Sequence, residues 1–239
     1  MDVYYKDLDS AKENAAKEAL KYINDAEIIG VGTGSTVEKF IDLLSRVYND
    51  YRDRYFTASS IDTMLKLRKI GFKVLHQSIV DHMDVYIDGA DEVDGELNMV
   101  KGGGAALTLE KILAYYSRKR VFIVDYTKIV KYLGEKHPIP LEVIPQALAM
   151  VYKILKDKGY NPTIRYPVKG KYGPVIADTG GVIIDIRPGR IDPLKLEMEL
   201  KTIPGIVETG LFINFADIVI VGYKDRVDVR SRARSFYEK

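Results

Sequence analysis

Short apolar segments alternate with amphipathic ones through the first half of the chain, and this alternation restricts the fold more than any other sequence feature. The apolar runs are typical of buried strands, and the segments between them carry apolar residues at helical spacing. We expect strands at Glu27–Val31, Tyr55–Ser59, Phe72–Leu75, Asp84–Ile87 and Val121–Val124. Strands that alternate with helices favour a mostly parallel, doubly wound α/β sheet, whose ligands bind beyond the carboxyl ends of the strands.

Two helices of this half are defined by their spacing and their ends. In Ser10–Ile23 an apolar residue recurs at every fourth position. Asp62–Ile70 is followed by Gly71, and glycine is common just after the last turn of a helix. Lys12 and Lys17 lie on polar faces of the first helix, where solvent exposure is the ordinary interpretation, although a lysine there could reach a ligand phosphate.

The first expected strand leads directly into a loop of glycines and hydroxyl residues: Gly32, Thr33, Gly34, Ser35 and Thr36. We expect Ser35 to cap the helix that follows, with Glu38 reaching back as in a capping box. Backbone N–H groups at a helix start, together with hydroxyls, form an anion-binding site. The loop lacks the GK[ST] of a Walker A motif and the third glycine of GxGxxG. A sugar phosphate or a mononucleotide is therefore favoured over a dinucleotide.

A second glycine loop lies in Asp88–Lys111, which reads DGADEVDGELNMVKGGGAALTLEK. It combines acids, a lysine and three glycines with a glutamate in the following helix: Asp88, Asp91, Glu92, Lys101, Gly102, Gly103, Gly104 and Glu110. Glycine lets backbone N–H groups approach an anionic oxygen closely. A base and an oxyanion cradle from one segment indicate proton abstraction beside a carbonyl.

Each part of this segment also has an ordinary structural interpretation. Three glycines alone are more often a flexible turn, and an acid near a helix start is usually a dipole or capping residue. Asp88 and Asp91 alone would indicate turn residues or a pair of metal ligands. The catalytic interpretation depends on the combination with the upstream glycine loop.

Composition excludes several classes of function. Acidic and basic residues nearly balance, with 36 Lys and Arg against 34 Asp and Glu and a net charge of +2, so no nucleic-acid partner is expected. Cysteine is absent, which excludes disulfides and thiolate catalysis. The histidines (His76, His82, His137) are scattered, so no zinc site is expected. Without a membrane-length apolar run or a signal peptide, we expect a cytoplasmic protein with no membrane partner.

The pattern changes near Leu133. Strands at Leu141–Ile144, Thr163–Tyr166, Pro174–Ala177 and Val182–Ile186, with helices at Gln146–Lys158 and Pro193–Thr202, indicate a ferredoxin-like α+β insert. We expect a Rossmann-like domain of residues 1–134 and 206–239 and an insert of residues 135–205. Strands Gly210–Ile213 and Asp217–Val221 are expected to rejoin the main domain, and Lys224–Lys239 to form a solvated helix.

Three motifs resemble the ribose-5-phosphate isomerase family of type A: VGTGSTV (Val31–Val37), DGADEVD (Asp88–Asp94) and KGGGAALTLEK (Lys101–Lys111). IPLEVIP (Ile139–Pro145) and IPGIVETGLF (Ile203–Phe212) are similar to later segments of that family. The resemblance implies a Rossmann-like domain with a ferredoxin-like insert. It also implies metal-free and cofactor-free interconversion of ribose 5-phosphate and ribulose 5-phosphate, in the non-oxidative pentose phosphate pathway, by a homodimer or homotetramer.

The resemblance also assigns roles to residues. Glu110 takes the position of the general base that acts through a cis-enediolate, and Lys101 with the amides of Gly102–Gly104 would stabilise its charge. Asp88 and Asp91 match acids near the sugar hydroxyls. Further substrate or phosphate contacts would come from Thr33, Ser35, Thr36, Lys12 and Lys128, with Lys17 as a competitor of Lys12 and with Ser59 and Ser60 nearby.

Two points remain open at this stage. We expect Lys101 to point at a substrate oxygen rather than at Glu110, because an ion pair would make Glu110 a weaker base. Two other functions are consistent with some of the motifs: an acyl-CoA transferase with a glutamate nucleophile, and a non-catalytic sugar-phosphate sensor.

Overall fold

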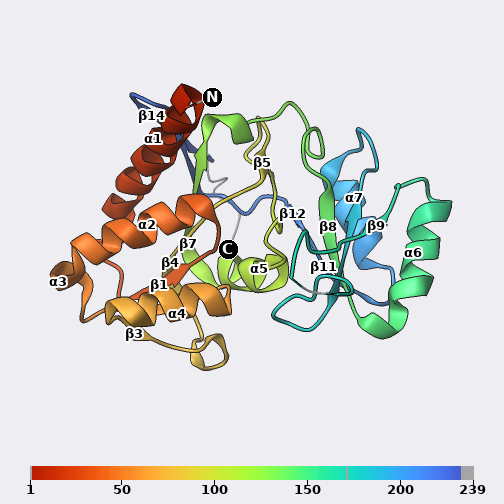
Figure 1. The fold of residues 1–239 in the computed structure, drawn as a ribbon, viewed down its shortest axis with the longest axis horizontal. Coiled ribbons are helices and arrows are strands. Elements are labelled where there is room, and N and C mark those ends of the chain that lie inside the picture. The colour runs from red at the N-terminus through yellow and green to blue at the C-terminus, as the bar shows by residue number, and fades with distance from the viewer. Residues whose placement is uncertain (1, 171, 233–239) are drawn as a thin grey trace. The chain divides into compact units, whose positions relative to one another are not determined.

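The computed structural model describes residues 2–170 and 172–232, and Figure 1 shows the path of the chain. These residues form two compact units. The first unit contains the described residues up to Ala90, Ile112–Lys128 and the described residues from Phe215 on. The second contains Asp91–Lys111 and Ile129–Asn214. The insert of residues 135–205 stays a prediction.

The first unit is built on a seven-stranded sheet with the order β14-β13-β7-β4-β1-β2-β3. All neighbouring strands are parallel except β13 and β14. The strands are β1 (Ile28–Val31), β2 (Tyr55–Ala58), β3 (Lys73–Val74), β4 (Met83–Asp88), β7 (Ser117–Asp125), β13 (Ile218–Gly222) and β14 (Val227–Ser231). The predicted mostly parallel α/β sheet is therefore confirmed.

Helices of this unit cover the sheet with small and aliphatic side chains. They are α1 (Asp2–Ala19), α2 (Ser35–Arg46), α3 (Tyr48–Tyr51) and α4 (Ile61–Ile70), and α1 packs beside α2 (Figure 1). Short 3₁₀ turns lie at Leu20–Tyr22, Gln77–Ile79 and Tyr126–Lys128. The predicted apolar stripe is confirmed, since Ala11, Ala15, Ala19 and Ile23 are fully buried. A Cβ atom on Gly222 would collide with the carbonyl of Ala11, so α1 packs closely on β13.

Two local predictions in this unit are wrong. Gly34, with a φ of 119°, occupies the N-cap position of α2 without a side-chain cap. Ser35 is thus the first helical residue, and Glu38 pairs with Lys66 at 2.6 Å rather than reaching back. The second error concerns the tail: Val227–Ser231 forms the edge strand β14 rather than a helix, and its two valines alternate with charged residues as an edge strand permits. Residues 233–239 of the predicted tail helix lie outside the described residues.

The second unit contains a four-stranded antiparallel sheet with the order β11-β8-β10-β9. Its elements follow as β8 (Ile139–Val143), a 3₁₀ turn (Pro145–Ala147), α6 (Leu148–Asp157), β9 (Thr163–Ile164), β10 (Val182–Ile186), α7 (Pro193–Lys201) and β11 (Ile206–Thr209). The order β-α-β-β-α-β, with the fourth strand beside the first, is that of a ferredoxin-like fold. Buried aliphatic residues such as Leu141, Val151, Ile184 and Leu200 fill the space between sheet and helices.

The second unit also contains a small three-stranded sheet that the sequence pattern does not show. Its order is β12-β6-β5, formed by Leu211–Phe212, Met99–Val100 and Glu92–Val93. The predicted strand Gly210–Ile213 is thus present as β12 in this small sheet, and its membership of the main domain stays a prediction. Pro174–Ala177 is not a strand, and only an isolated bridge joins Ile176 to Val182. The segments that form β5 and β6 show no periodic signal of a strand in the sequence.

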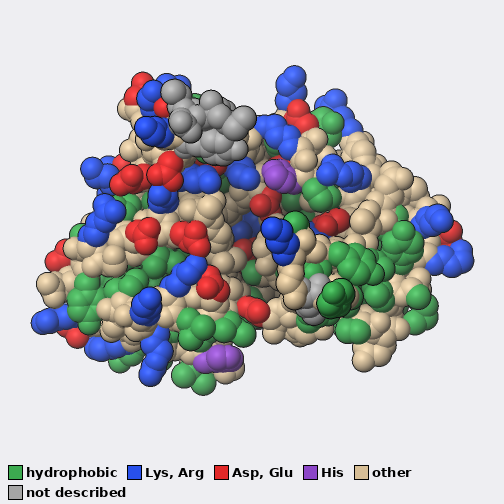
Figure 2. Space-filling view, viewed as in Figure 1, with side chains coloured by type: hydrophobic (Ala, Val, Ile, Leu, Met, Phe, Trp, Pro, Cys, Tyr) green, Lys and Arg blue, Asp and Glu red, His purple; other side chains and the backbone are tan. Residues whose placement is uncertain are grey.

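Neither a membrane-length apolar helix nor a cluster of candidate metal ligands occurs among the described residues. No helix among residues 2–170 and 172–232 is long and apolar enough to cross a membrane. The same residues contain no group of three or more His, Asp or Glu side chains that could hold a metal ion. On the face shown in Figure 2, basic and acidic side chains are interspersed, in line with the balanced composition.

Candidate active site

A buried lysine and a buried glutamate form the centre of the candidate site in the second unit. Lys101 follows β6, and its backbone N–H donates to the carbonyl of Gly210 at 2.9 Å. Glu110 lies in the first turn of α5 (Leu107–Tyr115). The two side chains are only 3% and 4% exposed, and Lys101 Nζ lies 3.3 Å from Glu110 Oε2. Lys101 Nζ also lies 5.4 Å from the centre of the Phe212 ring.

The direction of Lys101 differs from the expectation. We expected it to point away from Glu110, but its ammonium group faces the carboxylate. Burying either charge alone would be costly, and pairing two opposite charges reduces that cost. A substrate oxygen bound beside the Glu110 carboxylate would therefore also be close to Lys101 Nζ.

The glycines after Lys101 form a tight turn that closes in front of α5. Gly102 has a φ of 102°, and a Cβ atom there would lie 2.8 Å from Cβ of Leu107. The carbonyl of Gly102 accepts a hydrogen bond from the N–H of Ala105 at 3.0 Å. Gly103 and Gly104 are exposed, as an anion-binding backbone requires. The predicted glycine cradle is thus a defined turn rather than an extended linker.

Asp91 braces this turn. Its Oδ2 accepts a hydrogen bond from the N–H of Gly103 at 2.7 Å, and its own N–H donates to the carbonyl of Val100 at 2.8 Å. A Cβ atom on Gly103 would lie 2.8 Å from Asp91 Oδ1, so only glycine fits without displacing the carboxylate. Asp91 therefore binds the glycine turn that follows Lys101. The sequence did not predict this contact.

The first unit holds the other predicted residues at the carboxyl edge of its sheet. Asp88 ends β4 and is fully buried. Its Oδ1 accepts hydrogen bonds from the N–H groups of Thr33 at 3.2 Å and Gly89 at 2.7 Å. Its Oδ2 accepts one from the hydroxyl of Tyr86 at 2.6 Å. Asp88 thus holds the loop between β1 and α2 in place.

Hydroxyl groups and a lysine surround the start of α2. Lys12 Nζ donates to Ser35 Oγ at 2.9 Å, and Ser35 with Thr36 begins the helix. Thr63 Oγ1 donates to the carbonyl of Gly32 at 2.9 Å. Lys17 is exposed on α1, with no interaction among the described residues. Between the two competing lysines, the structure therefore brings Lys12 to the glycine loop.

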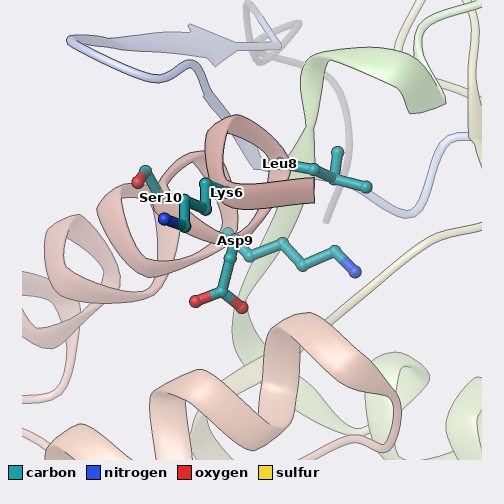
Figure 3. A pocket seen from close by; sticks show the side chains of 5 residues that line it. Lys6, Leu8, Asp9 and Ser10 are labelled. Atoms are coloured by element: carbon teal, nitrogen blue, oxygen red, sulfur yellow. The ribbon is translucent and has the colours of Figure 1, made fainter. Parts of the chain in front are cut away.

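The start of α1 borders a pocket lined by Lys6, Leu8, Asp9, Ser10 and Lys12. Figure 3 shows these side chains projecting from the first turns of α1. Asp9 pairs with Lys39 at 2.7 Å, which raises the pKa of Lys39, chiefly through the hydrogen bond between them. Lys12 thus lies between an open pocket and the hydroxyl of Ser35.

Three further residues named from the resemblance lie just beyond the ends of strands in this sheet. Lys128 ends the short 3₁₀ turn that follows β7, the neighbour of β4. Ser59 follows β2 and is fully buried, and Ser60 caps α4 by accepting a hydrogen bond from the N–H of Thr63. Ser60 therefore has a structural role. Ser59 Oγ has no hydrogen-bond partner in the part of the chain that the structure describes.

The second unit thus holds a buried ion pair beside a glycine turn, and the first unit holds a hydroxyl loop at a helix start; features of each kind occur in enzymes that act on small anionic substrates. Comparison with known proteins makes the class specific. The family model of ribose 5-phosphate isomerase A (phosphoriboisomerase A) matches residues 55–226.

Relatives with that function cover nearly the whole chain. The ribose-5-phosphate isomerase A of Pyrococcus abyssi is 45% identical over 94% of this chain and 99% of its own length. That of Thermococcus kodakarensis is 43% identical over 92% of this chain and 97% of its own length. The chain belongs to the ribose 5-phosphate isomerase A family.

Solved structures agree with this assignment. A D-ribose-5-phosphate isomerase in complex with phospho-erythronic acid has a TM-score of 0.89 and is 43% identical, covering 94% of this chain and 99% of that chain. Ribose 5-phosphate isomerase A from Methanocaldococcus jannaschii has a TM-score of 0.87 and is 38% identical, covering 93% of this chain and 98% of that chain. The chain therefore shares the fold of this family as well as its sequence motifs.

Proposed function

We propose that Glu110 moves a proton between the first and second carbons of the sugar as the chain interconverts ribose 5-phosphate and ribulose 5-phosphate. The observation that carries this proposal is the buried pair of Glu110 and Lys101 beside the Gly102–Ala105 turn. A carboxylate on the first turn of a helix is held in a fixed place, as a general base needs to be. As a member of its family, the chain is an aldose–ketose isomerase.

The proposed reaction needs no oxidant or reductant. Glu110 removes the proton on carbon 2 of the open-chain aldose, and the electron pair forms the carbon–carbon double bond of a cis-enediolate. The proton of the carbon-2 hydroxyl passes to the oxygen on carbon 1, and Glu110 returns its proton to carbon 1. One hydrogen thus moves from carbon 2 to carbon 1, and the aldehyde becomes a ketone.

The enediolate oxygens carry negative charge, and two groups of the second unit are suited to stabilise it. Lys101 supplies an ammonium group next to Glu110, and the exposed glycine turn supplies the backbone N–H of Gly104, since the N–H of Gly103 already donates to Asp91. Preorganised donors of this kind contribute most to catalysis where charge develops in the transition state. Asp91 and Asp88 are proposed to contact the sugar hydroxyls, where one of them assists ring opening.

A phosphate contact is proposed for the loop that precedes α2. Ser35 and Thr36 stand at the start of α2, and Lys12 adds a positive charge at 2.9 Å from Ser35 Oγ. Gly32, Thr33 and Gly34 complete this loop, and Lys128 is a further substrate contact in the proposal. A helix start with hydroxyls and a lysine is a suitable site for a phosphate.

Other parts of the proposal extend the family resemblance. They comprise a cytoplasmic location, a homodimer or homotetramer, catalysis without metal or cofactor, and a place in the non-oxidative pentose phosphate pathway. The family match favours the isomerase over an acyl-CoA transferase or a sensor. Covalent labelling of Glu110 by a CoA thioester would instead support the transferase.

Isomerisation in deuterated water tests the role of Glu110. A proton held by Glu110 exchanges in part with solvent, so ribulose 5-phosphate formed by the wild type should carry deuterium on carbon 1, measured by NMR. Glu110→Gln should lose this uptake but still bind phospho-erythronic acid, which offers a carboxylate and a phosphate. Deuterium uptake at the wild-type rate in Glu110→Gln would remove Glu110 from the role.

A further inference from the structure

Arg165 contacts the glycine turn from the four-stranded sheet, and no step of the proposed reaction uses it. It follows β9, and its Nη1 donates hydrogen bonds to the carbonyls of Gly102 at 2.8 Å and Gly103 at 3.0 Å. The same guanidinium donates through Nε and Nη2 to the two carboxylate oxygens of Asp185, at 2.8 and 2.5 Å. Asp185 lies on the neighbouring strand β10. One planar group is thus held by a carboxylate and holds two backbone carbonyls.

Holding these carbonyls sets the direction of two N–H groups. In a trans peptide the C=O and the following N–H point in opposite directions. The carbonyl of Gly102 shares its peptide plane with the N–H of Gly103, and the carbonyl of Gly103 shares its plane with the N–H of Gly104. Because Arg165 binds both carbonyls, both N–H groups are directed away from the guanidinium.

The two N–H groups differ in their hydrogen-bond partners. The N–H of Gly103 donates to Asp91 Oδ2 at 2.7 Å, so this peptide is held at both ends. The N–H of Gly104 makes no hydrogen bond within residues 2–170 and 172–232, and Gly104 is exposed. Arg165 therefore fixes the direction of a backbone donor that is free to bind a substrate oxygen.

We propose that Arg165 is a positioning residue that fixes the glycine turn and so aims the free N–H of Gly104, and that Asp185 orients Arg165. The inference rests on the proposed function, because the aimed donor matters only if the turn binds a reacting oxygen. The ferredoxin-like sheet then contributes to catalysis through the turn without touching substrate.

The geometry requires an arginine in this position. A guanidinium has five N–H donors in a fixed plane, whereas the ammonium of lysine is a compact point charge. Lysine could reach Asp185 or the carbonyls, but it could not bind both in the same plane. Arg165→Lys therefore keeps the charge and removes the fixed geometry, which makes it the sharpest variant.

The chain offers a matched control in the first unit. Arg120 forms the same two-pronged pair with Asp217, through Nε at 3.1 Å and Nη2 at 3.0 Å. Its side chain is 25% exposed, against 17% for Arg165, so the two pairs have similar surroundings. Arg120 makes no contact with the glycine turn among the described residues. Arg120→Lys thus shows how much kcat and amide hydrogen exchange change when such an ion pair is lost away from the glycine turn.

The test measures two properties of wild type, Arg165→Lys, Asp185→Asn and Arg120→Lys. The first is kcat and KM for ribose 5-phosphate, and the second is amide hydrogen exchange of peptides that contain residues 102–105. For Arg165→Lys we expect kcat to fall by about 10-fold to 100-fold, because small displacements of catalytic groups have effects of this order. KM should change less than about threefold, exchange in the turn should quicken, and Asp185→Asn should show a smaller change in the same direction.

Every other result counts against the inference. Unchanged kcat and exchange in Arg165→Lys would overturn it, as would a fall in kcat without faster exchange in the turn. An equal fall in Arg120→Lys would show a general effect of losing an ion pair. If Arg165→Lys does not fold, Asp185→Asn decides by the same criteria. An inactive wild type would refute the proposed function, while the exchange data would still decide whether Arg165 fixes the turn.

Discussion

At the scale of single residues, the contact between Gly103 and Asp91 gives the most specific expectation. Gly103→Ala adds a methyl group that would lie 2.8 Å from Asp91 Oδ1 and 3.1 Å from Oδ2, so the carboxylate has to move. We expect kcat/KM for ribose 5-phosphate to fall by about tenfold or more, because the turn and Asp91 shift together. Steady-state kinetics on the folded variant measures this.

Gly95→Ala is the matched control for that substitution. A Cβ atom on Gly95 meets nothing within 4 Å, and Gly95 is not among the glycines with positive φ. Its kcat/KM should remain close to that of the wild type. Equal activity of Gly103→Ala and Gly95→Ala would show that the Asp91 contact is not needed for catalysis.

At the scale of elements, Lys111 fastens α5 to two other elements of the second unit. Its Nζ lies 2.9 Å from Glu197 Oε1 on α7 and 2.9 Å from Glu208 Oε1 on β11. Lys111→Met leaves the mostly buried Glu197 without a cation and leaves Glu208 with only Lys201, and breaking a buried pair costs about 3–5 kcal/mol. We therefore expect a clear fall in the thermal unfolding midpoint.

An exposed pair on α6 provides the control. Lys153 pairs with Asp157 at 2.6 Å, but these side chains are 75% and 61% exposed. Solvent screening makes such pairs nearly neutral, so Lys153→Met should leave the unfolding midpoint almost unchanged. Similar midpoints for Lys111→Met and Lys153→Met would refute the fastening role of Lys111.

The same cluster predicts a pH dependence. Burial alone would raise the pKa of Glu208, but the charge and hydrogen bond of Lys111, with donors from Thr209 and Lys201, outweigh it and lower the pKa from its ordinary value of 4.5. A lowered pKa in the folded state contributes stability above the unfolded value, and this contribution is lost as pH falls through the folded value. We expect Glu208→Gln to be less stable than wild type at pH 7, with the difference shrinking below about pH 4.5. Unfolding midpoints across this range measure it, and a constant difference would contradict the assignment.

Sequence periodicity predicts some strands of this chain and misses others. The strands of the parallel sheet and the strand Val182–Ile186 are predicted correctly, because each is a run of apolar residues between turn residues. The edge strand β14 and the two-residue strands β5 and β6 are not predicted, and β12 is predicted as a strand but not its place in the small sheet. Their pairing depends on neighbours distant in the chain, so local sequence carries little signal for them.

At the scale of the whole molecule, the motifs predict which residues are candidates but not which atoms meet. The Lys101–Glu110 pair and the Asp91 contact with Gly103 depend on side-chain directions inside a folded unit. Arg165 was expected only as part of a strand, and it lies far along the chain from the turn that it binds. Such contacts come from tertiary packing, which spacing within a motif does not encode.

We propose that this chain isomerises ribose 5-phosphate with Glu110 as the base and without a metal. The formation of ribulose 5-phosphate by wild type and by Glu110→Gln, both in EDTA, tests this. We expect sustained turnover by the wild type and a fall of at least about 100-fold in the variant, the lower end for acid–base catalysis. Near-normal turnover by Glu110→Gln, or none by folded wild type at its working temperature, would contradict it.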